Sequence, residues 1–587
     1  MKLQKIFLAI LGLTFILQSC ENILDSRDDN HNTFESVYDY PSYAEGLLIN
    51  AYTKIPANNL SDLDVATDDA VTNNKFSGYL RMATGEWSAK YNPLNQWGNL
   101  FEGIIYINRF LDDVVDSVVW KWTDREIDEL YVKRFKGEAY TLRALFQYHL
   151  LVTVAGVGEN NELLGIPIYT SFPETEEEFN KPRASFTESV NQIYADIDKA
   201  LEYLTMDEYV DVNSAAELPS GYENVDVSKY NDVFGLDANQ RVNGRFAKAL
   251  KARVALLAAS PAFSNDDATL WANAANYAVN VLESIGGING LDPEGHKFYE
   301  ASVVNSVNLL NGNDQPEIVL RSAIRNTNTR EAANFPPSLF GDGEINPSQN
   351  LVDAFPMANG YPIEHSLAGY DADTPYANRD PRLSLYIVYN GSTMKGQTIT
   401  TGVGGGVNAK DSLNTSTRTG YYIRKLLRED VNTNPSSSTT QEHYEAYMRY
   451  TELFLIYAEA ANEAWGPDGK GGNSFSAREV VAAIRERAGI NQPDNYLASI
   501  SGKDEMREII RNERRLELCF EGFRFWDLRR WKSGLTEPAK GVNINKSGQF
   551  EYVNVEQRIY DNNYMHYGPL PSTELLKFNA LIQNKGW

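Results

Sequence analysis

The sequence predicts a mainly α-helical protein in which paired helices form one frame and long loop-rich insertions carry a few short strands. Apolar residues recur at helical spacing wherever the pattern is clear, and the helical segments come in alanine-rich pairs joined by turns. Gly, Pro, Asn, Ser and Thr instead crowd two stretches, residues 57–96 and 285–440, where helical periodicity is lost. Long irregular loops in a compact protein are usually functional.

The first residues have the pattern of a secretory signal. Lys2 and Lys5 precede an apolar run from Ile6 to Leu17, which is shorter than the roughly 20 residues that cross a bilayer as a helix. We therefore expect residues 1–19 to be a signal peptide. No other segment of the sequence has the roughly 18 consecutive apolar residues that a membrane-spanning helix needs.

The residues that end this signal resemble a bacterial lipobox, in which the cysteine becomes the lipidated first residue of the mature protein. Here they are Leu17-Gln18-Ser19-Cys20, with Gln18 where a small residue is more usual. The resemblance implies lipidation at Cys20, and the alternative is a free thiol beside a cleavage site. Residues 20–34 are polar and acidic, so we expect a tether whose acyl chains hold the protein body on a membrane.

Three helical pairs are predicted along the chain. The first joins 131–151 to 187–204, the second joins 245–259 to 269–284, and the third joins 444–464 to 476–488. Alanine-rich pairs of this kind resemble tetratricopeptide units, although the strict period of about 34 residues is absent. Long insertions between the pairs explain the lost period. In the loop-rich region, extended runs at 383–389 and 421–427 predict short strands.

Residues 503–531 carry the densest pattern in the sequence. Apolar side chains follow one helical face, while arginines alternate with carboxylates around them. Arginine forks paired with carboxylates inside a packed region fix orientation without doing chemistry, so we interpret this segment as scaffold. Cys519 lies on the apolar face, and we expect it to be a buried small hydrophobe.

Composition and missing motifs exclude several functions. The 54 Lys and Arg residues against 79 Asp and Glu give a net charge of −25, which argues against nucleic acid as a partner. Two cysteines cannot form a disulfide framework, and no pair among the six histidines has metal-ligand spacing, so we predict neither a zinc site nor a cofactor. Bound calcium is the alternative that the sequence leaves open. The glycine-rich run 402–406 lacks the Gly-Lys-Ser/Thr of a phosphate-binding loop, and no G-x-S-x-G elbow occurs.

Several segments together resemble one known family. Glu513–Trp531 resembles the signature of the SusD/RagB lipoproteins, in which a glutamate-and-arginine run leads into Phe-Glu-Gly, an arginine, an aromatic pair and Asp-Leu-Arg-Arg-Trp. Asn378–Leu383 is similar to the family's Arg-Asp-Pro-Arg-Leu element, and Arg449–Ala464 to its alanine-rich helix. Trp97–Leu111 resembles its early helix and Pro569–Trp587 its C-terminus. The matches run in order from the lipobox to the last residue.

The resemblance implies an N-terminal SusD-like helical region over 35–330 and a C-terminal RagB/SusD region over 331–587, packed as one compact unit. It also implies a lipid anchor on the outer face of the outer membrane and a SusC-like TonB-dependent transporter as partner. Family members close over the transporter barrel like a lid and capture oligosaccharides for import. They bind their ligand and do not cleave it, so the resemblance implies that this protein is not an enzyme.

The family motifs are scaffold, so candidate ligand contacts come from the chemistry of sugars. A sugar has polar hydroxyl edges and apolar C–H faces, so its site needs flat aromatic rings flanked by Asp, Asn or Arg. The chain is 12% aromatic, and the loop 68–92 is our first choice because its family counterpart lies at the ligand face. The predicted ligand-binding residues are Asp68, Asp69, Arg81, Trp87 and Tyr91 in this loop, and Arg325, Phe335, Phe340 and Tyr361 in a second loop region.

Alternatives remain for one residue and for the function. Trp87 has core packing under the long loop as its alternative role. Capture of peptides, as by RagB, is a second binding function that the same fold permits. A glycoside hydrolase is a third hypothesis, because 79 carboxylates leave room for a catalytic pair whose separation in space the sequence does not give.

Overall fold

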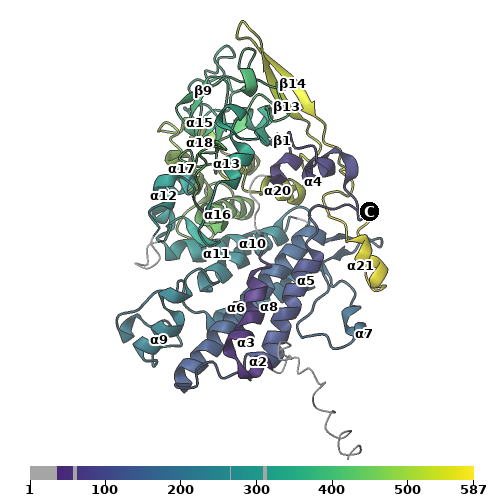
Figure 1. Cartoon of the computed structure of the whole chain (residues 1–587), viewed down its shortest axis with the longest axis vertical. Helices are drawn as coiled ribbons and strands as arrows, with labels where there is room; N and C mark the ends of the chain where they lie inside the picture. The colour runs from purple at the N-terminus through teal and green to yellow at the C-terminus, as the bar shows by residue number, and fades with distance from the viewer. Residues whose placement is uncertain (1–35, 57–61, 265, 308–313) are drawn as a thin grey trace, which may run out of the picture.

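The computed structural model describes residues 36–56, 62–264, 266–307 and 314–587. Long helices fill the lower and middle parts of the molecule in Figure 1, and shorter helices with two-stranded sheets fill the upper part. The predicted signal peptide, the predicted tether and Cys20 lie outside the described residues. Of the helices described, none has both the length and the apolar character that crossing a membrane requires.

The structure confirms the mainly helical fold class. The longer helices are α3 (Pro41–Tyr52), α5 (Trp97–Arg109), α6 (Arg125–Val154), α8 (Phe186–Tyr203), α10 (Gly244–Ala259), α11 (Ala268–Ser284), α16 (Tyr450–Trp465), α17 (Ala477–Arg487) and α19 (Lys503–Glu517). The short helices are α2 (Ser36–Asp39), α4 (Gly78–Arg81), α7 (Glu176–Phe179), α9 (Val227–Phe234), α12 (Ala301–Val304), α13 (Thr329–Asn334), α14 (Gln349–Ala354), α15 (Pro381–Tyr386), α18 (Asn495–Ser499), α20 (Arg524–Trp531) and α21 (Ser572–Lys577).

The predicted helical pairs are present and pack against one another. Helix α6 packs on α8, α10 on α11, and α16 on α17, while α16 also lies along α11. The helix starts follow local sequence signals: Ser185 and Ser476 each form a capping box with a glutamate three residues on. The Asn243 side chain accepts a hydrogen bond from the backbone of Phe246 at the start of α10.

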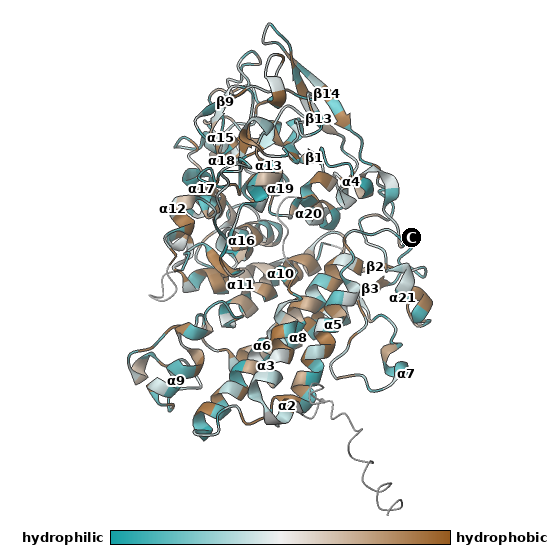
Figure 2. Ribbon diagram, in the orientation of Figure 1, coloured by the Kyte–Doolittle hydropathy of each residue, from teal (hydrophilic) through white to brown (hydrophobic). Residues whose placement is uncertain are grey.

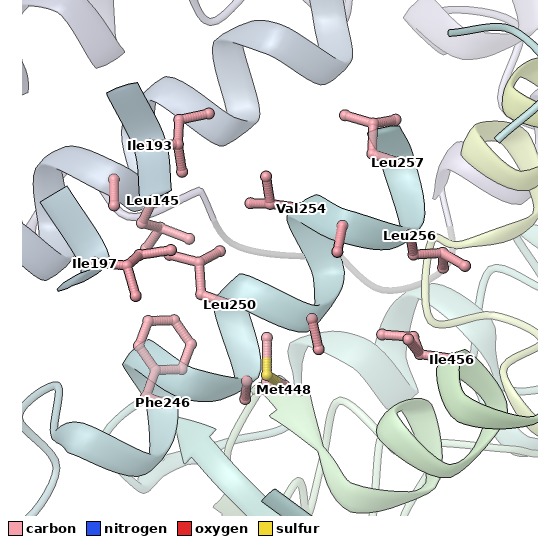
Figure 3. Packing of buried hydrophobic residues seen from close by; sticks show 14 of the residues in the cluster. Leu145, Ile193, Ile197, Phe246, Leu250, Val254, Leu256, Leu257, Met448 and Ile456 are labelled. Atoms are coloured by element: carbon pink, nitrogen blue, oxygen red, sulfur yellow. The ribbon is translucent and has the colours of Figure 1, made fainter. Parts of the chain in front are cut away.

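The core lies around α10, whose ribbon is coloured largely as hydrophobic in Figure 2. Figure 3 shows Phe246 and Leu250 of α10 beside Ile197 of α8, with Ile456 of α16 at the other side of α10. One continuous hydrophobic cluster reaches from α3 through α10 to α19. The early and late parts of the chain therefore share a single core.

The strands form two-stranded antiparallel sheets throughout the described residues. The pairs are β1 (Ala70–Thr72) with β6 (Ile345–Pro347), β2 (Gly156–Val157) with β3 (Leu163–Leu164), β4 (Ile318–Arg321) with β12 (Ala446–Arg449), β5 (Arg325–Thr327) with β11 (Gln441–His443), β7 (Ile387–Val388) with β10 (Tyr422–Ile423), β8 (Ser392–Met394) with β9 (Gln397–Ile399), and β13 (Ala539–Ile544) with β14 (Phe550–Glu556). The β13–β14 hairpin lies at the top of the molecule in Figure 1.

Three predicted elements differ in the structure. Of the predicted strand 421–427, only β10 (Tyr422–Ile423) is extended. Most of the predicted strand 383–389 is helix α15, because Pro381 stands at its first position and the Asp380 side chain accepts from the backbone of Arg382. Only β7 at its end is extended. The predicted helix 444–464 starts at Tyr450, since the residues before it pair as β12 with β4.

The segment 503–531 is scaffold, as predicted, but it is not one helix. Phe520 and Gly522 have φ angles of 60° and 77°, and this left-handed turn separates α19 from α20. The Arg382 guanidinium contacts Glu513 of α19 at 2.5 Å, and Arg449 contacts Glu521 at 2.7 Å, all in the interior. Cys519 is buried as expected, and burial raises the pKa of its thiol to about 12.

Candidate ligand-binding surface

Strand pairing brings the two predicted loop regions together. Strand β1 follows Asp69, and β6 lies in the second region, with Ala70 opposite Pro347 and Thr72 opposite Ile345. The Ser348 backbone and side chain also donate hydrogen bonds to the carbonyls of Asp69 and Asp68. Residues about 275 positions apart in the chain therefore form one surface, a relation that local sequence patterns do not reveal.

Two asparagines hold the loops that continue from these strands. The Asn73 side chain donates to the carbonyl oxygens of Asp342 and Gly343, each at 2.8 Å. The Asn74 side chain donates to the Glu344 carboxylate at 2.6 Å. We call the surface formed by residues 73–92 and 340–344 the loop face; helix α4, part of it, lies at the right of Figure 1.

Arg81 and Tyr91 form a pair on the loop face, in which Arg81 is exposed and Tyr91 is partly buried. The Arg81 guanidinium lies 4.2 Å from the centre of the Tyr91 ring and also contacts the Glu86 carboxylate, with Nε at 2.9 Å. The Arg81 and Glu86 side chains are 46% and 50% exposed. Hydrogen bonding to Arg81 lowers the pKa of Glu86. The structure thus brings together two of the predicted residues, with a planar cation over an aromatic ring at the surface.

Phe76 is the most exposed aromatic residue described, at 93%, and the sequence-based prediction did not include it. Its backbone N–H donates to the Asn74 side chain, so a short turn places the ring in solvent. The sequence does carry one indication that Phe76 is exposed: it is a single phenylalanine within the polar run Asn73–Ser77. That run has no helical or strand-like apolar pattern that would place the ring in a core.

Phe340 is the second exposed aromatic residue of the loop face. It is 55% exposed and has a φ angle of 63°, a conformation that costs a bulky L-residue free energy. The residue follows the 3₁₀ turn Pro337–Leu339. The fold therefore holds this ring at the surface in a strained backbone conformation.

Asp68 and Asp69, which the sequence predicts as ligand contacts, are buried in ion pairs. Arg515 donates to Asp69 at 2.7 Å and to Asp68 at 2.8 Å, and Arg524 donates to Asp68 at 3.0 Å. Burial alone would raise the pKa of Asp68, but the two guanidinium groups outweigh it and lower the pKa to about 2. Burial and the Asp68 charge raise the pKa of Asp69. These aspartates attach the first loop to α19 and α20, which corrects the prediction.

Trp87 and Phe335 are core residues, and their burial does not fit the predicted role as ligand contacts. Trp87 is 3% exposed, and its indole N–H donates to Asn92. Its ring packs edge-on against Phe525 and Trp587, with centroid distances of 5.8 and 4.8 Å. Phe335 is fully buried in a separate cluster. Trp87 therefore has the alternative role, core packing under the loop.

The last two predicted residues lie apart from the loop face. Arg325 is an exposed residue of β5, paired with His443 of β11. The Tyr361 ring lies 4.6 Å from the His365 ring and 5.3 Å from the Tyr496 ring of α18. Tyr496 lines a cavity of about 330 Å³ that Asp353 also lines. Of the tryptophans inside the family-like segments, Trp97 and Trp531 are buried and Trp526 is partly buried.

Within the described ranges, no group of His, Cys, Asp and Glu residues is arranged to hold a metal ion. On the loop face, the carboxylates of Glu86 and Glu344 are each engaged by a neighbouring side chain. What the face offers a ligand is exposed aromatic surface beside a guanidinium group.

Comparison with known proteins identifies the family. A model of the SusD family matches residues 317–587, and a model described as "Starch-binding associating with outer membrane" matches residues 22–217. The chain belongs to the SusD/RagB family, which confirms the resemblance found in its sequence. The family binds carbohydrate and is associated with the outer membrane.

Two named relatives come from Formosa agariphila. SusD-like protein P2 is 34% identical over 140 residues, which are 23% of this chain and 24% of that protein. SusD-like protein P38 is 36% identical over 104 residues, 17% of this chain and 18% of that protein. The matched segments thus span a quarter or less of each relative.

Solved structures share the fold over nearly the whole chain. A SusD-like protein from Bacteroides fragilis has a TM-score of 0.70 at 22% identity, covering 95% of this chain and 99% of that one. A SusD-like carbohydrate binding protein from the same species has a TM-score of 0.66 at 19% identity, covering 93% and 99%. Surface glycan-binding protein A from Bacteroides fluxus has a TM-score of 0.59 at 19% identity, covering 93% and 100%.

Proposed function

We propose that the protein is a cell-surface lipoprotein that captures oligosaccharides and delivers them to a SusC-like TonB-dependent transporter of the outer membrane. Family membership, with its carbohydrate binding and outer-membrane association, supports this function. The lipobox-like sequence ending at Cys20 supports anchoring by lipid. Two proteins of the same fold are named for binding carbohydrate or surface glycan.

One observation carries the ligand assignment: the loop face exposes rings that the core does not use. Phe76 is 93% exposed and Phe340 is 55% exposed, and Tyr91 lies under the Arg81 guanidinium. Exposed aromatic rings match the apolar C–H faces of a sugar ring, and guanidinium and amide groups match its hydroxyls. The site is therefore the loop face, with Phe76 added to the predicted residues and the buried ones withdrawn.

We propose binding without cleavage. Glycoside hydrolysis needs two carboxyl groups facing the scissile bond, one of them able to donate a proton. Four carboxylates in or beneath the loop face have other tasks: Glu86 binds Arg81, Glu344 binds Asn74, and Asp68 and Asp69 are buried with arginines. Asp342, two residues from Phe340, is exposed, and one carboxylate is not the pair that hydrolysis needs. This supports a binding surface on which the sugar is held and later released unchanged.

A binding screen tests the proposal. The protein without its lipid is titrated by calorimetry with a panel of soluble oligosaccharides, polysaccharides and peptides. Phe76→Ala is expected to weaken glycan binding about two- to tenfold, the amount expected for one aromatic contact. Trp122→Ala is the matched control, because Trp122 is also an exposed ring, at 76%, but lies in the loop before α6.

Other outcomes would contradict the proposal. Peptide binding without any glycan binding would favour the RagB-like alternative, and release of sugar from a polysaccharide would favour the hydrolase. Equal losses in Phe76→Ala and Trp122→Ala would remove the loop face as the site.

A second experiment tests the transporter partner: membranes of the source cells are solubilised and the protein is captured. A large β-barrel transporter is expected to copurify. Its absence would contradict delivery to a transporter and leave oligosaccharide capture as the function.

A further inference from the structure

A cavity of about 330 Å³ lies between α14, α18 and α19 and shares no residue with the loop face. Figure 1 shows α18 at the left of the molecule, whereas α4 of the loop face is at the right. The volume falls at the lower end of the range of small-molecule sites, roughly 300 to 1,000 Å³. The cavity is therefore large enough for a small ligand.

A buried arginine of α17 fixes the two segments that carry aromatic rings beside this cavity. Arg485 Nη2 donates to the carbonyl of Gly360 at 2.8 Å, and Arg485 Nε donates to Asp494 at 2.6 Å. Asp494 in turn caps α18 by accepting from the backbone of Leu497. Because Arg485 is 3% exposed, an interior group sets the loop at Gly360 against α18. Ligand contacts on these segments are thus preorganised.

Tyr496 of α18 is the aromatic residue of the lining, and its side chain is partly exposed. Its ring lies 5.3 Å from the Tyr361 ring and 5.7 Å from the His365 ring, so two neighbours from the loop hold it in place. Apolar residues form another part of the wall: Ala354, Pro356, Pro362 and Ile509. The cavity therefore offers a ring and apolar surface to the C–H face of a ligand.

Four polar atoms of the lining take part in no hydrogen bond with any residue that the structure describes, yet each stays open to solvent: Arg515 Nη1, Asp353 Oδ2, Asn512 Oδ1 and the Tyr496 hydroxyl. Their side chains are held by other bonds. Gln349 donates to Asp353 Oδ1 at 2.7 Å. Asn512 donates to the Ala354 carbonyl at 2.9 Å, and Arg515 is held by the buried aspartates. One donor, two acceptors and a hydroxyl match a ligand whose groups both donate and accept, as sugar hydroxyls do.

The charges of the lining favour a neutral ligand. Its two arginines are already bound in buried ion pairs. Of its three carboxylates, Glu364 and Glu508 are exposed, where solvent screens them. Since Asp353 and Arg515 line the same cavity, a charged ligand of either sign would meet a like charge as well as an opposite one.

We propose that this cavity is a second saccharide subsite, which binds one neutral sugar ring. The C–H face of the ring lies against the Tyr496 side chain. Adjacent hydroxyls donate to Asp353 and Asn512 and accept from Arg515 Nη1. The inference rests on the proposed function for the class of ligand, but it uses no residue of the loop face.

Single sugar rings test the subsite in a protein whose loop face is weakened. The methyl glycosides of glucose, galactose, mannose and xylose are titrated into Phe76→Ala, and their binding is followed by ligand-observed NMR. At least one glycoside is expected to bind, and adding Tyr496→Ala is expected to weaken that binding about tenfold. No glycoside binding to Phe76→Ala, or equal binding to the single and double variants, would overturn the proposal.

Further variants separate ligand contact from loss of structure. Tyr496→Phe keeps the ring and its packing and is expected to weaken glycoside binding about threefold, as is Asp353→Asn, which keeps the shape of the side chain. Tyr43→Ala is the matched control, because Tyr43 is a 47% exposed tyrosine on α3. Unchanged affinity in both Tyr496→Phe and Asp353→Asn would overturn the subsite even if Tyr496→Ala fails to fold.

The subsite and the loop face fail independently. Binding that Phe76→Ala abolishes and Tyr496→Ala leaves unchanged would overturn the subsite and leave the loop face as the site. Binding that Tyr496→Ala abolishes and Phe76→Ala leaves unchanged would support the subsite and contradict the loop face.

Discussion

Two arginine–carboxylate groups contain carboxylates of the same loop, residues 68–92, and have opposite surroundings. Arg515 and Arg524 hold Asp68 and Asp69 in the interior, where Asp69 is fully buried. Arg81 holds Glu86 at the surface, where both side chains are about half exposed. The first group attaches the loop to the frame, and the second leaves a cation and a ring available to a ligand.

The same contrast holds for the aromatic residues of this loop. Trp87 is packed against Phe525, Tyr560 and Trp587, whereas Phe76 contacts solvent over most of its surface. Residue type therefore does not decide between scaffold and binding surface. What decides is whether a distant part of the chain supplies a partner: Arg515 lies 446 positions from Asp69.

The largest expected effect is that of Trp87→Ala on stability. Truncating a buried tryptophan removes its contacts and leaves a cavity, which lowers the free energy of unfolding by about 3 to 5 kcal/mol. Denaturant unfolding measures this change, and Phe76→Ala is the matched control, with no expected loss. A Trp87→Ala variant with unchanged stability and no glycan binding would show that Trp87 contacts the ligand. That result would contradict the contrast drawn between Trp87 and Phe76.

Arg515→Ala is expected to have the next largest effect. It removes one partner of the two buried aspartates, and breaking a buried pair completely costs about 3 to 5 kcal/mol. Arg524 still contacts Asp68, so we expect a smaller loss in the free energy of unfolding, about 2 to 3 kcal/mol. Arg81→Ala is the exposed counterpart, and we expect unchanged stability with weaker glycan binding. Equal stability losses in the two variants would contradict the division into buried and exposed pairs.

The helical frame was predictable because its signals are local. The cap of helix α10 at Asn243 and the apolar face of that helix lie within a few turns of each other in the sequence. The interleaved arginines and carboxylates of residues 503–531 likewise predicted that this segment is scaffold. Helix α15 was mistaken for a strand, since its alternating Leu383–Tyr389 sequence outweighed the start signal at Asp380 and Pro381.

The candidate site was predictable only in part. The choice of the 68–92 loop led to Arg81 and Tyr91, which the structure places in contact at the surface. The prediction included Asp68 and Trp87 because carboxylates and indole rings can bind sugars. Both are buried by residues far away in the sequence: Arg515 of α19 contacts Asp68, and Trp587 packs against Trp87. Local sequence patterns do not reveal such contacts. Phe76 was missed, since exposure of one ring leaves no periodic pattern to read.

The smallest expected effect is on acid stability, and it sharpens the comparison between Asp68 and Glu86. The paired arginines lower the pKa of Asp68 from about 3.8 in the unfolded chain to about 2. A lowered pKa adds stability that is fully present above pH 4 and is lost as the pH falls toward 2. This group therefore contributes about 2 kcal/mol of acid-sensitive stability.

Unfolding free energies measured from pH 5 to pH 2 test this contribution. Asp68→Asn is expected to be less stable than the natural protein at pH 5 and to show a shallower decline below pH 4, because the Asp68 carboxylate is no longer there to be protonated. Glu86→Gln is the control: hydrogen bonding to Arg81 also lowers the pKa of Glu86, but solvent screens the exposed pair, so the decline should match that of the natural protein. Parallel declines in all three proteins would show that Arg515 and Arg524 do not hold Asp68 as a stabilising ion, and the buried pair would then be equivalent to the exposed one.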